Sequence, residues 1–159
     1  MSDSNIRRAT PADADTIIAF NAAMAAETED RQLDRAVLAG GVRRVLADPS
    51  LGMYYLAQRD GNIVGQLLIT CESSDWRNAL FWWIQSVYVL PAARRRGMYR
   101  ALHEHVVRAA RQAGNVCGVR LYVDKRNTAA QAVYRRLGLR PSEYDLYETD
   151  WSLPPVRPP

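Results

Sequence analysis

Residues 87–102 read VYVLPAARRRGMYRAL, and this stretch decides the fold. Residues 79–90 form a long run of β-branched and aromatic residues, which predicts a strand. After Pro91 the apolar residues recur with the period of a helix. The N-terminus of a helix presents backbone N–H groups and the positive end of the helix dipole, and here three arginines and Gly97 surround it. The stretch therefore predicts strand, loop and helix around an anion site that suits a pyrophosphate, with a solvated arginine-rich loop as the alternative.

The strand over 79–90 is apolar on both of its faces. Strict alternation places Phe81, Trp83, Val87 and Val89 on one face, and Leu80, Trp82, Ile84 and Tyr88 on the other. A strand covered on both sides belongs in the middle of a sheet that has helices packed on it. For Phe81, Trp82, Trp83 and Trp76 we therefore favour core packing over a role in substrate recognition.

The rest of the chain alternates between strand and helix patterns. We expect further strands at 6–9, 53–58, 63–70, 119–123 and 144–151. We expect helices after the Thr10-Pro11 cap, over 34–46, from Met98 to a stop at Gly114, and over 127–137. The Asp60-Gly61 pair predicts a hairpin turn. This order indicates a mixed α/β domain built on one sheet.

Length and composition are those of one soluble domain. The chain has 159 residues, of which 48% are hydrophobic and 24% are charged. Its net charge is +4, and nearly all of its basic residues are arginines. No stretch is apolar for long enough to cross a bilayer, and the first ten residues have no apolar secretion core, so we expect a cytoplasmic protein without a membrane partner. Residues 152–159 are half proline, which predicts a poorly ordered tail.

The two cysteines, Cys71 and Cys117, are too few for a disulfide scaffold or a four-ligand zinc site. We expect both to be reduced thiols in the core, and we expect no metal.

A second segment, downstream of 119–123, helps to decide between a pyrophosphate site and a solvated loop at residues 94–97. Asn127, Ala130 and Tyr134 follow at helical spacing and share one face. Alone, such a tyrosine is usually a core residue. In order with the arginine-rich loop, it forms a far more specific pattern.

These two segments together resemble the GNAT superfamily of N-acetyltransferases, which move an acetyl group from acetyl-CoA to an amine. The family's pyrophosphate loop, Q/R-x-x-G-x-G/A, matches Arg94 and Gly97, with Tyr99 where the family has Gly or Ala. The downstream motif N-x-x-A-x-x-x-Y-x-x-x-G-F matches Asn127, Ala130, Tyr134 and Gly138, with Leu139 in place of Phe. In element order the resemblance covers about residues 6–151.

The resemblance implies a fold and a cofactor site. The fold is a single domain over 1–151, with a mixed, mostly antiparallel central sheet of six to seven strands, splayed at the centre and flanked by about four helices. The implied CoA-binding residues are Val87, Tyr88, Val89, Arg94, Arg95, Arg96, Gly97, Met98, Tyr99, Arg100, Asn127, Ala130 and Tyr134. Backbone groups of Val87 and Val89 would face the pantetheine and the acetyl carbonyl.

The resemblance also implies direct transfer, with Tyr134 as the general acid that protonates the CoA thiolate. The acceptor amine must lose a proton before it attacks. Many family members carry an acidic base where this chain has Gln85 and Ser86. Deprotonation is therefore expected to run through water, with the help of one of four carboxylates that the sequence does not separate. These are Glu27, Glu29, Glu72 and Asp124.

Several functions stay open at this point. The first is acetylation of a primary amine of a small molecule, and protein lysine or N-terminal amines are a second acceptor class. A catalytically weak acyl-CoA-binding regulator is the alternative suggested by Gln85. A nucleic-acid binder using residues 94–96 is disfavoured, because few aromatic residues lie near that run. Pairing of two copies through the final strands would give a homodimer.

Overall fold

The computed structural model describes residues 4–152, and the chain divides into two compact units, Met1–Tyr122 and Val123–Pro159. The first unit holds a sheet and the helices α1 to α3, and the second holds α4 (Thr128–Arg136). The tail predicted over 152–159 lies, except for Ser152, outside the described residues.

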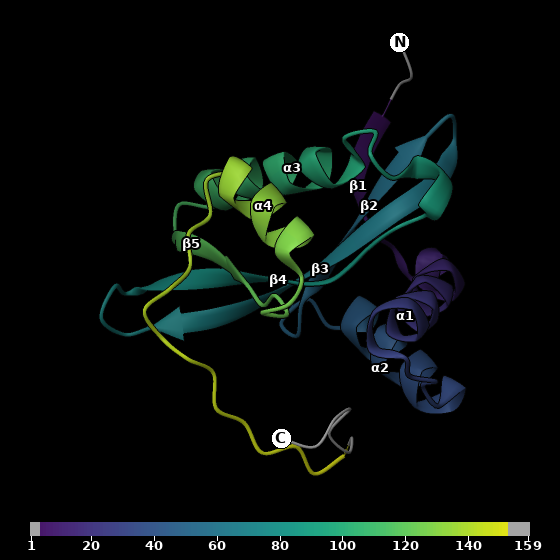
Figure 1. Ribbon diagram of the computed structural model, residues 1–159, viewed down its shortest axis with the longest axis horizontal. Coiled ribbons are helices and arrows are strands. Elements are labelled where there is room, and N and C mark those ends of the chain that lie inside the picture. The colour runs from purple at the N-terminus through teal and green to yellow at the C-terminus, as the bar shows by residue number, and fades with distance from the viewer. Residues whose placement is uncertain (1–3, 153–159) are drawn as a thin grey trace. The chain divides into compact units, whose positions relative to one another are not determined.

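The sheet of the first unit has five strands in the order β1-β2-β3-β4-β5 (Figure 1). They are β1 (Ser4–Arg8), β2 (Met53–Arg59), β3 (Asn62–Ser74), β4 (Ala79–Val89) and β5 (Val116–Leu121). Neighbouring strands from β1 to β4 are antiparallel, and β5 runs parallel to β4. The mixed, mostly antiparallel sheet is thus confirmed, whereas the expected six to seven strands are corrected to five within the described residues.

The missing strand is the one predicted over 144–151. This segment alternates apolar and polar residues, but it forms no strand. Local turns occur at its two ends, where the Tyr144 N–H donates to Ser142 Oγ and the Ser152 N–H donates to Asp150 Oδ1. A strand exists only where a neighbouring strand accepts its ladder of hydrogen bonds, so the alternation is not sufficient by itself.

The helices of the first unit cover both faces of the sheet. Figure 1 shows α1 (Ala14–Glu29) and α2 (Arg35–Ala47) on one face and α3 (Met98–Gln112) on the other. Short 3-10 turns, η1 (Pro11–Asp13) and η2 (Pro91–Ala93), precede α1 and α3. Asp34 caps α2, its carboxylate accepting from the Val37 N–H at 2.9 Å.

Strand alternation produces two cores. On β2, Tyr55 and Ala57 face α3, where they join a buried cluster with Leu102 and Val106. Residues on the opposite face join a second buried cluster under α1 and α2: Tyr54, Leu56, Leu68, Ile17, Ile18 and Val42. Because side chains alternate between the two faces of β2, this strand contributes buried residues to both helical layers.

A β-bulge interrupts β4. Gln66 pairs with Tyr88 and Leu68 pairs with Gln85, so two residues of β4, Ser86 and Val87, lie opposite the single residue between Gln66 and Leu68. Ser86 takes the left-handed conformation, with φ of 49°.

The bulge corrects the predicted faces of β4, because one extra residue reverses the alternation beyond it. Val87 packs on the α3 side with Trp82 and Ile84, not with Trp83. Tyr88 instead contacts α1, its ring centroid 5.2 Å from that of Phe20.

Three further predictions are corrected. Both cysteines are exposed and not core thiols, Cys71 on β3 and Cys117 on β5. Trp76 is 85% exposed at the tip of a turn, while Trp82 is buried as expected. The strand predicted over 119–123 instead spans Val116–Leu121.

Candidate functional site

The sheet opens between β4 and β5. Their parallel register runs from Leu80 with Val116 to Ile84 with Leu121 and ends there. Within the described residues, the rest of β4, from Gln85 to Val89, pairs with β3 but not with β5. One edge of this stretch, which includes Val87 and Val89, therefore presents backbone groups next to an opening in the sheet.

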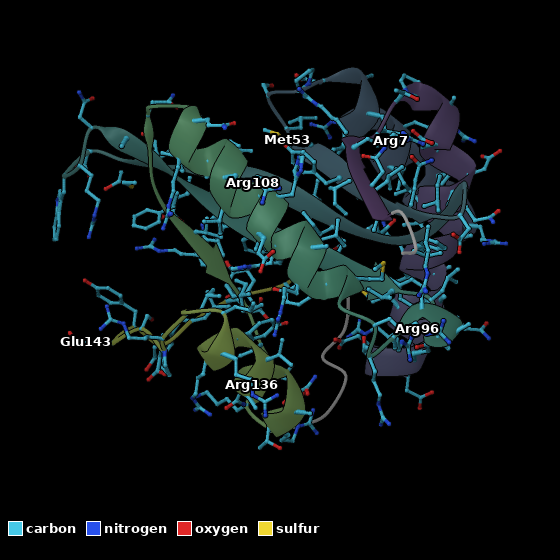
Figure 2. All side chains as sticks on the ribbon, turned by 90° about the horizontal axis from the view of Figure 1, so that it is seen from above. Arg7, Met53, Arg96, Arg108, Arg136 and Glu143 are labelled. Atoms are coloured by element: carbon cyan, nitrogen blue, oxygen red, sulfur yellow. The ribbon has the colours of Figure 1, made fainter. Side chains whose placement is uncertain are left out.

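The loop that follows β4 has the geometry of an anion site. Residues 94–97 are exposed, and Figure 2 labels Arg96 in this loop. Gly97 has φ of 79° and is the N-cap of α3, where no side chain of the described residues supplies a cap hydrogen bond. Nothing lies within 4 Å of the Cβ that a larger residue would have there, so a ligand can approach this backbone closely. The first bond of the helix runs from the Ala101 N–H to the Gly97 carbonyl at 2.9 Å, and the N–H groups that precede it point out of the helix end.

One arginine of the loop is held by the protein itself. Arg94 Nε donates to the Val89 carbonyl at 2.9 Å, and its guanidinium forms an ion pair with Glu27 of α1. Glu27 also accepts from the Tyr88 hydroxyl at 2.9 Å. Hydrogen bonds from Arg94 first and Tyr88 second lower the pKa of Glu27. A carboxylate held this way is a poor base, so Glu27 fixes the loop to β4 and α1.

Tyr99, the departure from the family's loop pattern, does not close the loop. Its ring lies along α3 with its centroid 6.1 Å from that of His103, one helical turn away. Met98 is buried beneath the helix start, while Arg100 is exposed. The approach to Gly97 therefore stays open.

Of the other candidate bases in the first unit, Glu72 is also engaged. Glu72 accepts from Trp83 Nε1 and from Arg120, both at 2.8 Å. Gln85 Nε2 donates to Thr70 Oγ1 at 2.6 Å. Glu29 is exposed at the end of α1. The sequence of β4, Ala79–Val89, itself contains no carboxylate.

Sequence reasoning missed a buried polar cluster behind the bulge. Gln66 is 0% exposed, and its Nε2 donates to Asn21 Oδ1 at 2.6 Å and to the Ser86 carbonyl at 3.2 Å. Asn21 in turn donates to the Tyr54 hydroxyl at 3.3 Å. The available signal was a glutamine inside the apolar run of β3, where a buried polar side chain needs a reason.

In the second unit, the predicted CoA-binding residues Asn127, Ala130 and Tyr134 all belong to α4 or to its N-cap. Asn127 is the N-cap of α4, its side chain accepting from the Ala130 N–H at 3.0 Å. Tyr134 lies on α4 and is half-buried, and burial raises the pKa of its hydroxyl. Asp124 pairs with Arg126 just before this helix. The Asn-x-x-Ala spacing is thus a capping motif that sets where the helix carrying Tyr134 starts.

The described residues contain neither a cluster of metal-ligating side chains nor a membrane-spanning helix. No group of three or more His, Cys, Asp or Glu side chains in residues 4–152 is arranged to hold a metal ion. None of the helices within that range is both long and apolar enough for a membrane crossing.

Comparison with known proteins identifies relatives over most of the chain. The family model for the acetyltransferase (GNAT) family matches residues 18–139. The crystal structure of a possible acetyltransferase from Clostridium difficile 630 is 39% identical, covers 94% of this chain and 99% of its own, and superposes with a TM-score of 0.88. No curated protein sequence matched the chain.

Two more distant structures share the fold. An aminoglycoside N-acetyltransferase in complex with CoA is 16% identical, with a TM-score of 0.77 over 96% of this chain and 97% of its own. A predicted acetyltransferase with acetyl-CoA from Clostridium acetobutylicum is 18% identical, with a TM-score of 0.75 over 92% of this chain and 96% of its own.

Proposed function

Because the chain belongs to the acetyltransferase (GNAT) family, we propose that it transfers the acetyl group of acetyl-CoA directly to a primary amine of a small molecule. The observation that carries this proposal is the open edge of β4 from Gln85 to Val89, which leads within one unit into the glycine-capped start of α3. An extended amide-bearing arm pairs with such an edge, and a phosphate group binds at such a helix end.

The residues present fit acetyl-CoA as the donor substrate. The backbone from Arg94 to Arg100 would hold the pyrophosphate, since no side chain of the described residues caps the helix end and Arg95 and Arg96 are exposed beside it. Val87, Tyr88 and Val89 would pair with the pantetheine arm. The second unit would contribute Asn127, Ala130 and Tyr134. Two structures with the same fold contain CoA or acetyl-CoA, which supports this assignment.

The reaction follows from these groups. The neutral amine attacks the thioester carbon, and the oxyanion that forms accepts hydrogen bonds from strand N–H groups near Val87. The C–S bond then breaks, and Tyr134 donates its proton to the departing thiolate. The new amide nitrogen releases its extra proton to solvent, and the Tyr134 phenolate regains a proton from solvent. The raised pKa of Tyr134 keeps its hydroxyl protonated at neutral pH, which is the form that this step needs.

The amine loses its proton to water in this proposal. Glu27 and Glu72 are occupied by arginines, and position 85 holds a glutamine that is bonded to Thr70. A relay through solvent therefore replaces the carboxylate that many relatives carry on this strand.

The test is release of free CoA thiol from acetyl-CoA in the presence of an amine panel. The panel contains a polyamine, an aminoglycoside, a lysine peptide and a peptide with a free N-terminus, and calorimetry with CoA runs in parallel. Turnover with a small amine supports the proposal, and turnover with a peptide alone moves the acceptor to proteins. CoA binding without turnover of any amine would identify a regulatory module. Absence of CoA binding at millimolar concentration would overturn the proposal altogether.

The remaining expectations belong to the same proposal. We propose that residues 1–151 act as one domain in the cytoplasm, as a homodimer, with neither a nucleic acid nor a membrane as partner and without a metal.

A further inference from the structure

We propose that Gln66 is a positioning residue for acetyl transfer, because its buried amide holds the Ser86 carbonyl and thereby fixes the bulge that presents Val87 to the acetyl group. The inference rests on the proposed function, since it assigns the backbone of the bulge to the site of the reacting carbonyl.

The backbone conformation of the bulge must be stabilised by contacts with surrounding residues. Ser86 has φ of 49°, a conformation that costs a residue with a Cβ about 1–2 kcal/mol. Such a residue keeps its conformation only where surrounding contacts determine it. The Gln66 amide supplies one of these contacts directly, at 3.2 Å from the Ser86 carbonyl oxygen.

The orientation of the Gln66 amide follows from its partners. Its Nε2 donates to two oxygens, Asn21 Oδ1 and the Ser86 carbonyl. Rotating the amide by half a turn would set its own oxygen against both acceptors, so only one orientation is compatible with the cluster. Asn21 is fixed in turn, because its Oδ1 accepts from Gln66 Nε2, and its amide nitrogen is thereby left to donate to the Tyr54 hydroxyl.

Stability alone does not explain a glutamine at this position. Gln66 Oε1 is buried and has no hydrogen-bond partner among the described residues, and such an atom costs about 1–3 kcal/mol. The next three residues of β3, Leu67, Leu68 and Ile69, are buried aliphatic side chains, so the neighbouring positions of this strand take apolar residues. A residue that breaks the local rule at a cost, beside a strained backbone, is the pattern of a functional site.

Helix α1 gives the cluster a rigid anchor. Asn21 holds Gln66 behind the bulge, Phe20 packs on Tyr88 just after it, and Glu27 binds both Tyr88 and Arg94 further along. The helix therefore secures β4 at the bulge and also at the loop that begins α3. A shift of the bulge by about 1 Å would displace the Val87 N–H from the developing oxyanion, an error of the size that costs about a hundredfold in rate.

The experiment compares Gln66→Met with the unaltered protein. Methionine fills a similar volume without an amide, so we expect kcat for acetyl transfer to fall about tenfold to a hundredfold. The dissociation constant for CoA, measured by calorimetry, should change less than about threefold, because the loop at Gly97 is untouched. Amide hydrogen exchange at Ser86 and Val87 should accelerate, which reports on the bulge without any turnover.

Two companion variants keep the test decisive. Asn21→Ala, on a different element, removes the anchor of Gln66 and should lower kcat in the same direction if Gln66→Met does not fold. Tyr55→Phe is the matched control, since it removes a buried hydroxyl from the opposite face of β2 and should leave kcat unchanged.

The outcomes separate the two proposals. If the unaltered protein binds CoA but turns over no amine, the proposed function fails, and the exchange experiment still decides whether Gln66 fixes the bulge. If the unaltered protein is active and Gln66→Met keeps its kcat and its exchange rates, the role of Gln66 is overturned while the proposed function stands.

Discussion

The Tyr134 hydroxyl carries the protonation step of the proposed reaction, and Tyr134→Phe removes it while keeping the ring. We expect kcat to fall about a hundredfold or more, which is the usual contribution of a general acid. The affinity for CoA should be nearly unchanged, because the ring still packs in the same place. Steady-state kinetics and calorimetry on one preparation give the two values.

Tyr147→Phe is the control for this prediction, since Tyr147 is in the same unit and 92% exposed. It should leave both kcat and affinity unaltered. Equal turnover by the Tyr134 and Tyr147 variants would remove the acid role.

At the scale of residues, the sequence named candidate site residues, whose roles stay predictions, but it did not predict the contacts that hold them. Arg94, Gly97 and Tyr134 could be named because they stand at positions of the motifs of the family that the sequence resembles. The pairing of Arg94 with Glu27 joins residues 67 positions apart, and the contact between Gln66 and Asn21 joins residues 45 apart. Contacts of that kind depend on the packing of α1 on the sheet, which no local pattern encodes.

At the scale of elements, the loop before α3 depends on the backbone of Gly97. Gly97→Ala places a Cβ at φ of 79°, which costs about 1 kcal/mol of folding stability even though the space is open. We also expect weaker CoA binding, by about tenfold, because the loop relaxes toward negative φ and its N–H groups turn away from the pyrophosphate. Urea unfolding and calorimetry measure the two effects.

Gly61→Ala is a closely matched control. Gly61 has the same φ of 79° and equally open surroundings, but it lies in the turn between β2 and β3. Both variants should lose similar stability, and only the Gly97 variant should lose CoA affinity. Equal affinities would place the pyrophosphate elsewhere.

The junction of β1 with α1 predicts a pH dependence of stability. Arg7 forms two hydrogen bonds of 2.8 Å with Asp13, and this interaction lowers the pKa of Asp13 from 3.8 to about 2. The folded-state pKa lies below the unfolded one, so the contribution is complete above about pH 4 and is lost as the pH falls toward 2. Its size is of the order of 2 kcal/mol.

Asp13→Asn tests this junction. At pH 7 the variant should unfold about 2 kcal/mol more easily than the unaltered protein, and the gap should narrow between pH 4 and pH 2. Asp15→Asn removes an exposed carboxylate two residues away and should produce no such gap. A difference at Asp13 that is independent of pH would mean that packing, not ionisation, is responsible. Urea denaturation across this pH range provides the measurement.

The elements also show where periodicity fails as a guide. Strand and helix patterns located β1 to β4 and the four α-helices of the described residues, including α4, in which no residue is fully buried. The faces beyond Ser86 were predicted wrongly, since a single bulged residue reverses the alternation. The segment 144–151 was predicted as a strand from alternation alone, although a strand also requires a partner.

At the scale of the whole molecule, the same segment supports the expected homodimer. It exposes large apolar side chains that a monomer rarely leaves in solvent. They are Tyr144, Leu146, Tyr147 and Trp151. Light scattering after gel filtration should give twice the monomer mass at micromolar concentration, and Tyr147→Ser combined with Trp151→Ser should give the monomer. Trp76→Ser, at another highly exposed tryptophan, should leave the dimer intact.

The unfinished ladder between β4 and β5 has a consequence for handling the protein. Along Gln85–Val89 one edge of β4 is not paired with β5. An extended segment of another molecule can form backbone hydrogen bonds with such an edge, which promotes aggregation. Protein stored without acetyl-CoA should therefore aggregate at a lower temperature than protein stored with it, because the bound pantetheine arm would cover these backbone groups.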